Sequence, residues 1–469
     1  MKNNYFLLLL IAFVSTIFLI SCNKTSSSTA ITPPVVPPVT PPIVTKGKSF
    51  YVSANIGVDA SSGLSVTTPF KSINRAHNSA VAGDTIFIMD GLYSFSVGST
   101  LNITTSGTAD KWITYKAYLN HKPKIFCAGS VWNAITINGS YIVFEGIEVY
   151  GNNAGLTYTD ALASYNNKLA GGTDNNRYAI YNTNGISIGG PNAESKFPHH
   201  ITIRNCNVHD FPGGGISSIQ ADYTIIEGNT VYNNAWYMMY AGSGISIYGP
   251  INSDGADINK YKNIVRNNIC YGNKTTIPWI SIVPARLSDG NGIIIDVNQY
   301  PYNQTTVTNK PYTGRTLVEN NLSYNNGGSG IHAYKADYVD IINNTSYGNG
   351  TVVGYGEIFA GDSKDVKIIN NIMYARTGGK CNENTRNTNV VYDFNIYFNG
   401  TTAVLGANDK RLNPLFVLLS VDPLTANFSI NLASPAADAG TKSIYAAKDI
   451  KGVTRPLGVN VDCGAYEVK

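Results

Sequence analysis

The sequence predicts an all-β protein whose main domain is a parallel β-helix, and three observations lead to this fold class. A short motif that ends in an aromatic residue recurs at a spacing of about 23 residues, as between Tyr324 and Tyr347, which is typical of solenoids. The apolar residues between these motifs alternate in short β-branched runs such as Ile201-Thr202-Ile203, which predict strands. Asparagine recurs at one corner of each period, where turns are expected.

The first residues predict export. Residues 6–20 form an apolar run that is short for a bilayer span, and it leads to Ser21-Cys22. A small residue directly before a cysteine resembles the lipobox of bacterial lipoproteins, in which Cys22 is lipidated and becomes the mature N-terminus. We therefore expect residues 1–22 to be a lipoprotein signal peptide, and the protein to lie at the outer membrane or cell surface. The alternative is a plain secretory signal with an incidental cysteine.

A stalk and one long domain follow. Residues 23–49 are rich in Ser, Thr and Pro, a composition that favours extended polyproline and buries nothing. No second linker interrupts residues 50–469, so we expect one continuous β-helix domain and a monomer. The net charge of +4 is spread thinly, without a Lys/Arg run, and indicates no nucleic-acid partner. The membrane contact that we expect is through the N-terminal lipid alone.

The cysteines beyond Cys22 predict neither a disulfide framework nor a zinc site. They are widely separated, show no CxxC or Cys/His spacing, and are odd in number, so they cannot all pair. We expect buried single thiols within the stacked core. The residues are Cys127, Cys206, Cys270, Cys381 and Cys463.

The corner asparagines predict a ladder. Asn tolerates the left-handed αL backbone conformation that a turn requires. Stacked at the strand spacing of about 4.8 Å, their side chains can also hydrogen-bond to one another. The corner residues are Asn229, Asn268, Asn321, Asn344, Asn371 and Asn395.

The ends of the domain carry a family resemblance. Pro69-Phe70-Lys71-Ser72 with a predicted helix at 73–80, then Ala82-Gly83-Asp84, resembles the N-terminal cap of the pectate-lyase-like superfamily of right-handed β-helix proteins. Ser434-Pro435-Ala436 and the residues up to Glu467 resemble the C-terminal capping segment of exported β-helix proteins. The resemblance implies a single right-handed parallel β-helix with a small N-terminal cap, and activity on an extracellular polysaccharide. The catalytic strings of the better known lyase and polygalacturonase families are absent.

A second register predicts the working face. Short Gly-Ile motifs recur one strand away from the asparagine corner, and if each Ile points inward, the next residue and the one two beyond it point outward. Three neighbouring strands, about 5 Å apart, then share one outer face. Their outward residues are Ser246 and Tyr248 on the first strand, Ile294 and Asp296 on the second, and His332 and Tyr334 on the third.

Insertions break the repeat spacing beside these strands, and on repeat proteins such insertions commonly form the walls of a binding site. The inserted stretches carry aromatic residues, whose faces stack on sugar rings. We therefore predict a polysaccharide-binding cleft centred on Asp296. Its predicted substrate-binding residues are Ser246, Tyr248, Trp236 and Tyr240, with Trp279 and Tyr312 as further aromatic candidates.

The first functional hypothesis is a lyase that cleaves a uronate-containing polysaccharide by β-elimination. This chemistry needs a cation on the carboxylate, a base for the C5 proton and an acid for the leaving oxygen. Arg286 or Lys335, or a calcium ion held by Asp289 and Asp296, would supply the cation. His332 or Lys335 would be the base, and Tyr248 or Tyr334 the acid. The structural alternatives are an Asx turn at Asp289 and a plain surface histidine at 332.

Two other functions remain open. A glycoside hydrolase needs two facing carboxyl groups, for which Asp289 and Asp296 are the obvious pair. A glycan-binding or adhesive surface protein needs only the aromatic residues. His209 and Asp210 form the alternative catalytic centre, one coil away.

Overall fold

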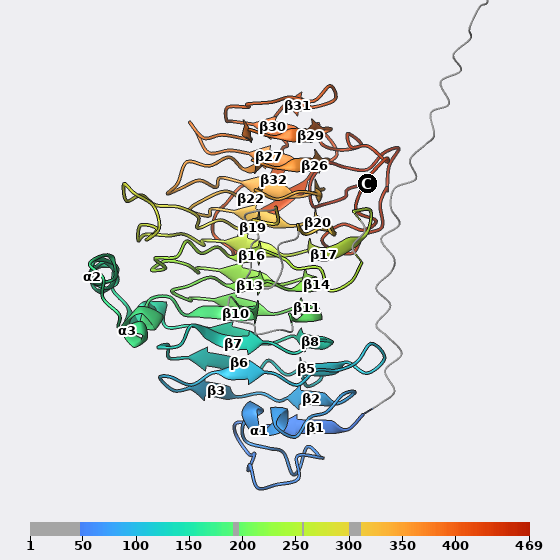
Figure 1. Cartoon of the computed structure of the whole chain (residues 1–469). Coiled ribbons are helices and arrows are strands. Elements are labelled where there is room, and N and C mark those ends of the chain that lie inside the picture. The colour runs from blue at the N-terminus through green and yellow to red at the C-terminus, as the bar shows by residue number, and fades with distance from the viewer. Residues whose placement is uncertain (1–46, 191–196, 256–257, 300–310) are drawn as a thin grey trace, which may run out of the picture.

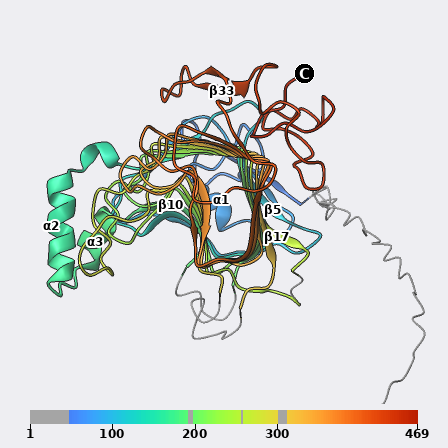
Figure 2. The same cartoon turned by 90° about the horizontal axis from the view of Figure 1, so that it is seen from above.

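The described residues of this computed structural model, 47–190, 197–255, 258–299 and 311–469, form a stack of β-coils. Each full coil contributes one strand to each of three parallel sheets, here named A, B and C, in that order along the chain. Figure 1 shows the coils rising from α1 to β31, and Figure 2 looks down the stack into the coil interior. The predicted all-β parallel β-helix is therefore confirmed.

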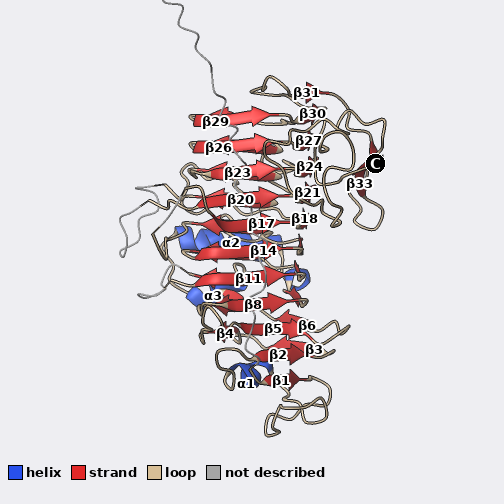
Figure 3. Cartoon of the chain, turned by 90° about the vertical axis from the view of Figure 1, so that its right-hand side faces the viewer, coloured by secondary structure: helices blue, strands red, loops and turns tan. Residues whose placement is uncertain are grey.

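Sheet A forms one long side of the stack, and Figure 3 shows its strands lying in register above one another. It comprises β1 (Ser49–Val52), β2 (Thr85–Ile88), β5 (Ile113–Ala117), β8 (Ile142–Glu145), β11 (His199–Arg204), β14 (Asp222–Glu227), β17 (Tyr261–Arg266), β20 (Arg315–Glu319), β23 (Val339–Ile342), β26 (Lys364–Ile369) and β29 (Thr388–Asp393).

Sheet B carries the aromatic end of each repeat motif. It comprises β3 (Leu92–Phe95), β6 (Lys124–Cys127), β9 (Glu148–Tyr150), β12 (Asn207–His209), β15 (Thr230–Tyr232), β18 (Ile269–Tyr271), β21 (Leu322–Tyr324), β24 (Thr345–Tyr347), β27 (Ile372–Tyr374), β30 (Ile396–Phe398) and β31 (Lys410–Arg411).

Sheet C carries the Gly-Ile register. It comprises β4 (Leu101–Ile103), β7 (Asn133–Ile137), β10 (Asn184–Gly189), β13 (Ile216–Ile219), β16 (Ile245–Tyr248), β19 (Ile293–Asp296), β22 (Ile331–Tyr334), β25 (Ile358–Gly361) and β28 (Asn384–Thr385). The remaining elements are α1 (Ile73–His77), the 3₁₀ turn at Asn153–Gly155, α2 (Tyr158–Leu169), α3 (Asn175–Ile180) and the antiparallel pair β32 (Phe416–Leu418) and β33 (Asn427–Ile430).

Isoleucines fill the inside of the coils. Ile245, Ile293 and Ile331 follow the predicted glycines, pair across β16, β19 and β22, and are fully buried in the main core. Burying one such side chain is worth about 1.5–3 kcal/mol, so each residue of the stack contributes to the stability of the core. Because alternation sends the intervening residues outward, the inward isoleucines also fix which side chains face the outside of sheet C.

The corner asparagines form the predicted ladder, but they do not adopt the αL conformation. The Asn268 amide donates to Asn321 Oδ1 at 3.0 Å, and Asn321 repeats the contact to Asn344. The positive φ angles lie one residue earlier, for example at Asn267 (56°) and Asn320 (54°), so the predicted position was wrong by one residue. The αL residue turns the chain, and the next asparagine can then point into the buried ladder.

A second ladder was not predicted. The amide of Asn234 donates to Asn273 Oδ1 and that of Asn273 to Asn326 Oδ1, both at 3.0 Å, and Asn326 donates to Asn349 at 2.9 Å. Asn349 in turn donates to Glu357 Oε2 at 2.6 Å. A buried carboxyl group therefore ends this row of amides.

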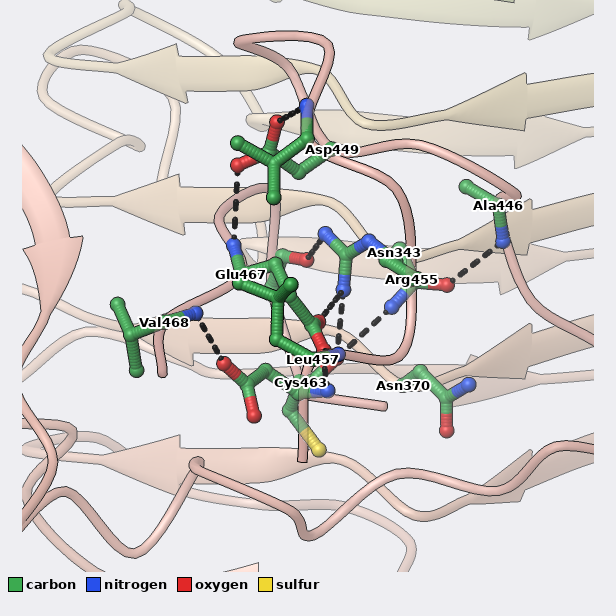
Figure 4. A network of polar contacts seen from close by, with 12 residues as sticks. Asn343, Asn370, Ala446, Asp449, Arg455, Leu457, Cys463, Glu467 and Val468 are labelled. Atoms are coloured by element: carbon green, nitrogen blue, oxygen red, sulfur yellow. Dashed lines mark hydrogen bonds and ion pairs between the residues drawn. The ribbon is translucent and has the colours of Figure 1, made fainter. Parts of the chain in front are cut away.

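The first and last described segments cover different parts of the stack. The N-terminal helix α1 is shorter than predicted and ends at His77, with the Ser72 side chain accepting from Arg75 N at its start. Residues after β31 pack along the outside of the last coils, where Figure 2 shows β33 and the C-terminus. Figure 4 shows the contacts: Asn343 accepts from Ala446 N at 3.0 Å, and Arg455 pairs with Glu467 at 3.1 Å, fully buried.

All five cysteines after Cys22 are free and buried, as predicted. The signal peptide, Cys22 and the stalk up to residue 46 lie outside the described residues, so their predictions stay untested. Within the described part of the chain, no helix is both long and apolar enough for a membrane span.

Candidate functional site

A cavity of about 780 Å³ lies on the outer face of sheet C, at β16, β19 and β22. Two insertions, at 236–242 and 275–288, supply its walls. Helices α2 and α3, which the sequence did not predict, support these walls, because Tyr165 and Tyr178 pack with Met239 and Ile277 of the two insertions. The broken repeat spacing therefore builds an enclosure of the size that small ligands occupy.

The strand register sets the floor of the cavity. Tyr248 pairs with Asp296 and Asp296 with Tyr334, so these three outward residues stand in one row. Ser246, Ile294 and His332 form the neighbouring row by the same pairing. All six line the cavity, together with Arg286, Asp289, Lys335 and Tyr240.

Asp296 is the most perturbed carboxyl group at the cavity. It ends β19, and its Oδ1 atom is buried without a hydrogen-bond partner. Burial, and next the charge of Asp289, raise its pKa well above the ordinary value, while Lys335 acts in the opposite direction. An unpaired buried carboxyl oxygen is costly, and such groups are typical of functional sites.

Asp289 is held by its neighbours. Its Oδ1 accepts from the Asn291 amide at 2.8 Å and its Oδ2 from the Ser288 hydroxyl at 3.0 Å, and burial raises its pKa to about 6. Both oxygens are therefore engaged, which does not favour the hypothesis of a calcium ion held with Asp296. Across the described ranges, no group of three or more His, Cys, Asp or Glu side chains forms a metal site.

His332 does not have the exposed imidazole that the sequence suggested. It is 4% exposed, its ring stacks on Phe359 with centroids 4.7 Å apart, and its Nδ1 lies 2.6 Å from Ser329 Oγ. Burial lowers its pKa to about 3, so the ring is neutral at neutral pH. A base of such low proton affinity is poorly matched to proton transfer at neutral pH. The physical reason is the cover of Phe359 and Tyr355, which period-two alternation does not predict.

Cations and tyrosines border Asp296. Lys335 follows β22 at a φ of 48°, and its ammonium lies 5.3 Å from the Tyr334 ring centroid. Burial and then the charge of Asp296 raise the pKa of Tyr248, and burial raises that of Tyr334. Both phenols therefore hold their protons more tightly than usual. Arg286 is exposed at the cavity wall.

The predicted aromatic residues divide between the cavity and other places. Tyr240 and Trp279 line the cavity. Trp236 does not: its indole donates to Gly272 O at 3.0 Å, and the Lys274 ammonium lies 4.2 Å from its ring centroid, so that cation occupies one ring face. Tyr312 is buried and donates to Asp222 at 2.8 Å, beside sheet A.

Sequence reasoning missed cavity residues from the next coils. Arg386 binds the Asp362 carboxylate through two nitrogens, and Tyr355 covers His332 with ring centroids 6.1 Å apart. Phe359 lies on β25, in the weaker sixth copy of the Gly-Ile register, and pairs with His332 of β22. Extending the alternation through that copy would have found Phe359, but no local pattern marks the loop residues Tyr355 and Arg386.

The alternative centre at His209 and Asp210 lies elsewhere. His209 Nδ1 lies 2.8 Å from Asp210 Oδ2 at the end of β12, in sheet B. Its ring stacks between Tyr150 and Tyr232, with centroids 5.5 and 4.5 Å away. This pair belongs to a row of stacked rings and does not border the sheet C cavity.

Comparisons with known proteins agree with the fold. A family model described as "Pel9A-like, right handed beta helix region" matches residues 50–371. The crystal structure of pectate lyase Pel9A aligns with a TM-score of 0.54 and 18% identity over 91% of this chain and 98% of that chain. A GH136 lacto-N-biosidase from Eubacterium ramulus aligns with a TM-score of 0.45 and 15% identity over 76% of this chain and 57% of that chain. No curated protein sequence matches. At these identities the structural likeness shows the fold alone.

Proposed function

The chain belongs to the Pel9A-like right-handed β-helix family, and from this premise we propose that it is an exported polysaccharide lyase that cleaves a uronate-containing chain by β-elimination. The observation that carries the proposal is Asp296, a carboxyl group of raised pKa with an unpartnered oxygen at an aromatic-lined cavity. The choice of an acidic substrate follows the family, since the solved Pel9A protein is a pectate lyase.

Asp296 is the general acid in this proposal. Because its pKa is raised, it keeps a proton at a higher pH than an ordinary aspartate and can give that proton to a leaving oxygen. Tyr248 and Tyr334 are the candidates that the sequence offers for this role. Burial raises the pKa of both, so they release protons less readily than unperturbed phenols.

Lys335 is the base, and it acts in its unprotonated amine form. The amine removes the C5 proton of the uronate, the electron pair forms the C4=C5 double bond, and the C4–O bond breaks. Asp296 protonates the departing oxygen, so the products are a new chain end and an unsaturated uronate. Arg286 and Arg386 at the cavity wall stabilise the negative charge that develops on the carboxylate during proton removal.

A glycoside hydrolase is the second candidate, and one observation favours it. Asp289 and Asp296 both have raised pKa values, and the charge of Asp289 contributes to the shift at Asp296. Neighbouring carboxyl groups with different environments are typical acid and base partners in glycoside hydrolysis. The hydrogen bonds that occupy both Asp289 oxygens make that residue the less accessible partner.

The deciding experiment incubates the protein with acidic and neutral polysaccharides and measures ultraviolet absorbance of unsaturated uronate beside reducing ends. We expect both signals to rise on an acidic chain. Asp296→Asn and Lys335→Gln should each lose about 10²- to 10⁴-fold in turnover. Asp110→Asn and Lys111→Gln, both exposed and outside the cavity lining, are the matched controls.

Each other result has a definite meaning. Reducing ends without absorbance would replace elimination by hydrolysis. Binding of a polysaccharide without either signal would make the protein a glycan binder. Full turnover in Asp296→Asn on a substrate that the wild type cleaves would remove the active site from this cavity.

A further inference from the structure

The hydrogen bonds beneath the cavity determine which ring nitrogen of His332 carries the proton. The backbone N–H of Ser329 donates to Asn291 Oδ1 at 2.9 Å, which fixes that atom as the amide oxygen. Ser329 Oγ lies 3.1 Å from the same oxygen and must therefore donate its one proton to it. His332 Nδ1, 2.6 Å from Ser329 Oγ, is then the donor of their hydrogen bond.

The other end of the Asn291 amide agrees with this assignment. Its Nδ2 donates to Ser243 Oγ at 3.0 Å and to Asp289 Oδ1 at 2.8 Å. A flipped amide would place its nitrogen against the Ser329 N–H donor and its oxygen against a carboxylate. The chain from Asp289 through Asn291 and Ser329 thus holds His332 as the Nδ1–H tautomer.

The second ring nitrogen, Nε2, is consequently a lone-pair acceptor. The buried ring carries a single proton at neutral pH, and that proton is on Nδ1. Among the described residues, no hydrogen bond reaches Nε2. Nε2 is also not a fully buried atom, so it retains contact with solvent. His332 lines the cavity, with its ring plane fixed by stacking on Phe359.

We propose that Nε2 of His332 is a specificity-determining acceptor for a sugar hydroxyl in the cavity, and that Ser329 and Asn291 are positioning residues that keep it unprotonated. This rests on the proposed function, because the ligand is the polysaccharide. Strand spacings place the Cα atoms of His332 and Asp296 roughly 8 Å apart, on adjacent strands and two residues along. A saccharide held against Asp296 can therefore also reach His332.

An acceptor at this position selects by chemistry. A hydroxyl group donates to it, whereas a carboxylate or an O-methylated position has no proton to offer and leaves the nitrogen unpaired. The uronate carboxylate is therefore expected to face the cationic side chains and a free hydroxyl to face His332. A modified sugar at this subsite should bind worse by at least about 10-fold.

The tautomer is tested on the full chain without any substrate. Nitrogen-15 NMR of histidine-labelled protein near pH 7 should show His332 with a protonated Nδ1 and an unprotonated Nε2, assigned by loss of its signals in His332→Phe. Ser329→Ala should weaken this preference, whereas His121→Gln, far from the cavity, should not. An Nε2–H tautomer or an imidazolium at that pH would overturn the assignment.

The ligand is tested with an oligogalacturonate. We expect the probe to shift the Nε2 resonance, and His332→Phe, which keeps a ring on Phe359, to weaken binding by at least about 10-fold. His332→Gln, which restores an acceptor near Nε2, should recover part of the loss. Binding of the probe that leaves Nε2 and the His332→Phe affinity unchanged would overturn the subsite. A protein that binds the probe through His332 but never cleaves it would refute only the lyase reaction.

Discussion

Glu357 ends one asparagine ladder, and its titration should govern part of the pH dependence of stability. Its Oε1 accepts from the backbone N–H of Asn349 at 2.8 Å, and its Oε2 accepts from the Ser346 hydroxyl and the Asn349 amide, both at 2.6 Å. Burial outweighs these bonds and raises the pKa of Glu357 from 4.5 to about 7. The folded protein therefore binds this proton more tightly than the unfolded chain.

The sign and size follow from linkage. The stabilisation that protonated Glu357 gives the folded state is fully present below the unfolded pKa of 4.5. It is lost as the pH rises through the folded pKa of about 7. Each tenfold change in proton affinity is worth about 1.4 kcal/mol, so the contribution of Glu357 is about 3 kcal/mol. Glu357→Gln removes this titration. The glutamine amide, in place of Oε2, cannot accept from Asn349, which costs about 1–2 kcal/mol at every pH.

The wild type should therefore be more stable than Glu357→Gln near pH 4, and the order should reverse near pH 8. Equilibrium urea unfolding followed by tryptophan fluorescence measures both free energies. Glu148→Gln, on a half-buried glutamate of sheet B, is the control and should retain the wild-type profile. If Glu357→Gln loses as much stability as the wild type between the two pH values, the buried carboxyl group is not the cause.

Three further predictions concern the ladder, the anchor and the thiols. Asn321→Ala should lower the free energy of unfolding by about 3–5 kcal/mol, because it removes contacts to Asn268, Val265 and Asn344 and leaves buried groups unpaired. Asn74→Ala, at an exposed position, is the control and should lower it by under about 1 kcal/mol in the same urea assay. Cys22→Ala should abolish lipid modification and move the protein out of the detergent phase; continued membrane fractionation would contradict the lipobox. The five buried cysteines should react with a thiol reagent only after unfolding, since burial raises the pKa of groups such as Cys206 to about 12, and fast native labelling would refute their burial.

The fold could be predicted because its rules are local and repeated. Period-two alternation identified Ile245, Ile293 and Ile331 as inward residues, and the recurring asparagines identified a ladder, since identical side chains stack when coils stack. The same alternation identified the row of Tyr248, Asp296 and Tyr334 on the outer face. The predicted position of the αL conformation was wrong by one residue. The ladder asparagine points inward, so the residue before it adopts αL and makes the turn.

The chemistry of the cavity was decided by contacts between distant parts of the chain. Alternation tells on which side of the sheet His332 lies, but its neutral, buried state depends on Phe359 and on a loop that carries Tyr355. The raised pKa of Asp296 likewise depends on walls from insertions whose paths no repeat prescribes. Periodic sequence therefore determined the scaffold and the direction of each side chain. Only the tertiary structure determined desolvation, and with it the protonation states on which function depends, because desolvation is set by what covers a side chain and not by its place in the repeat.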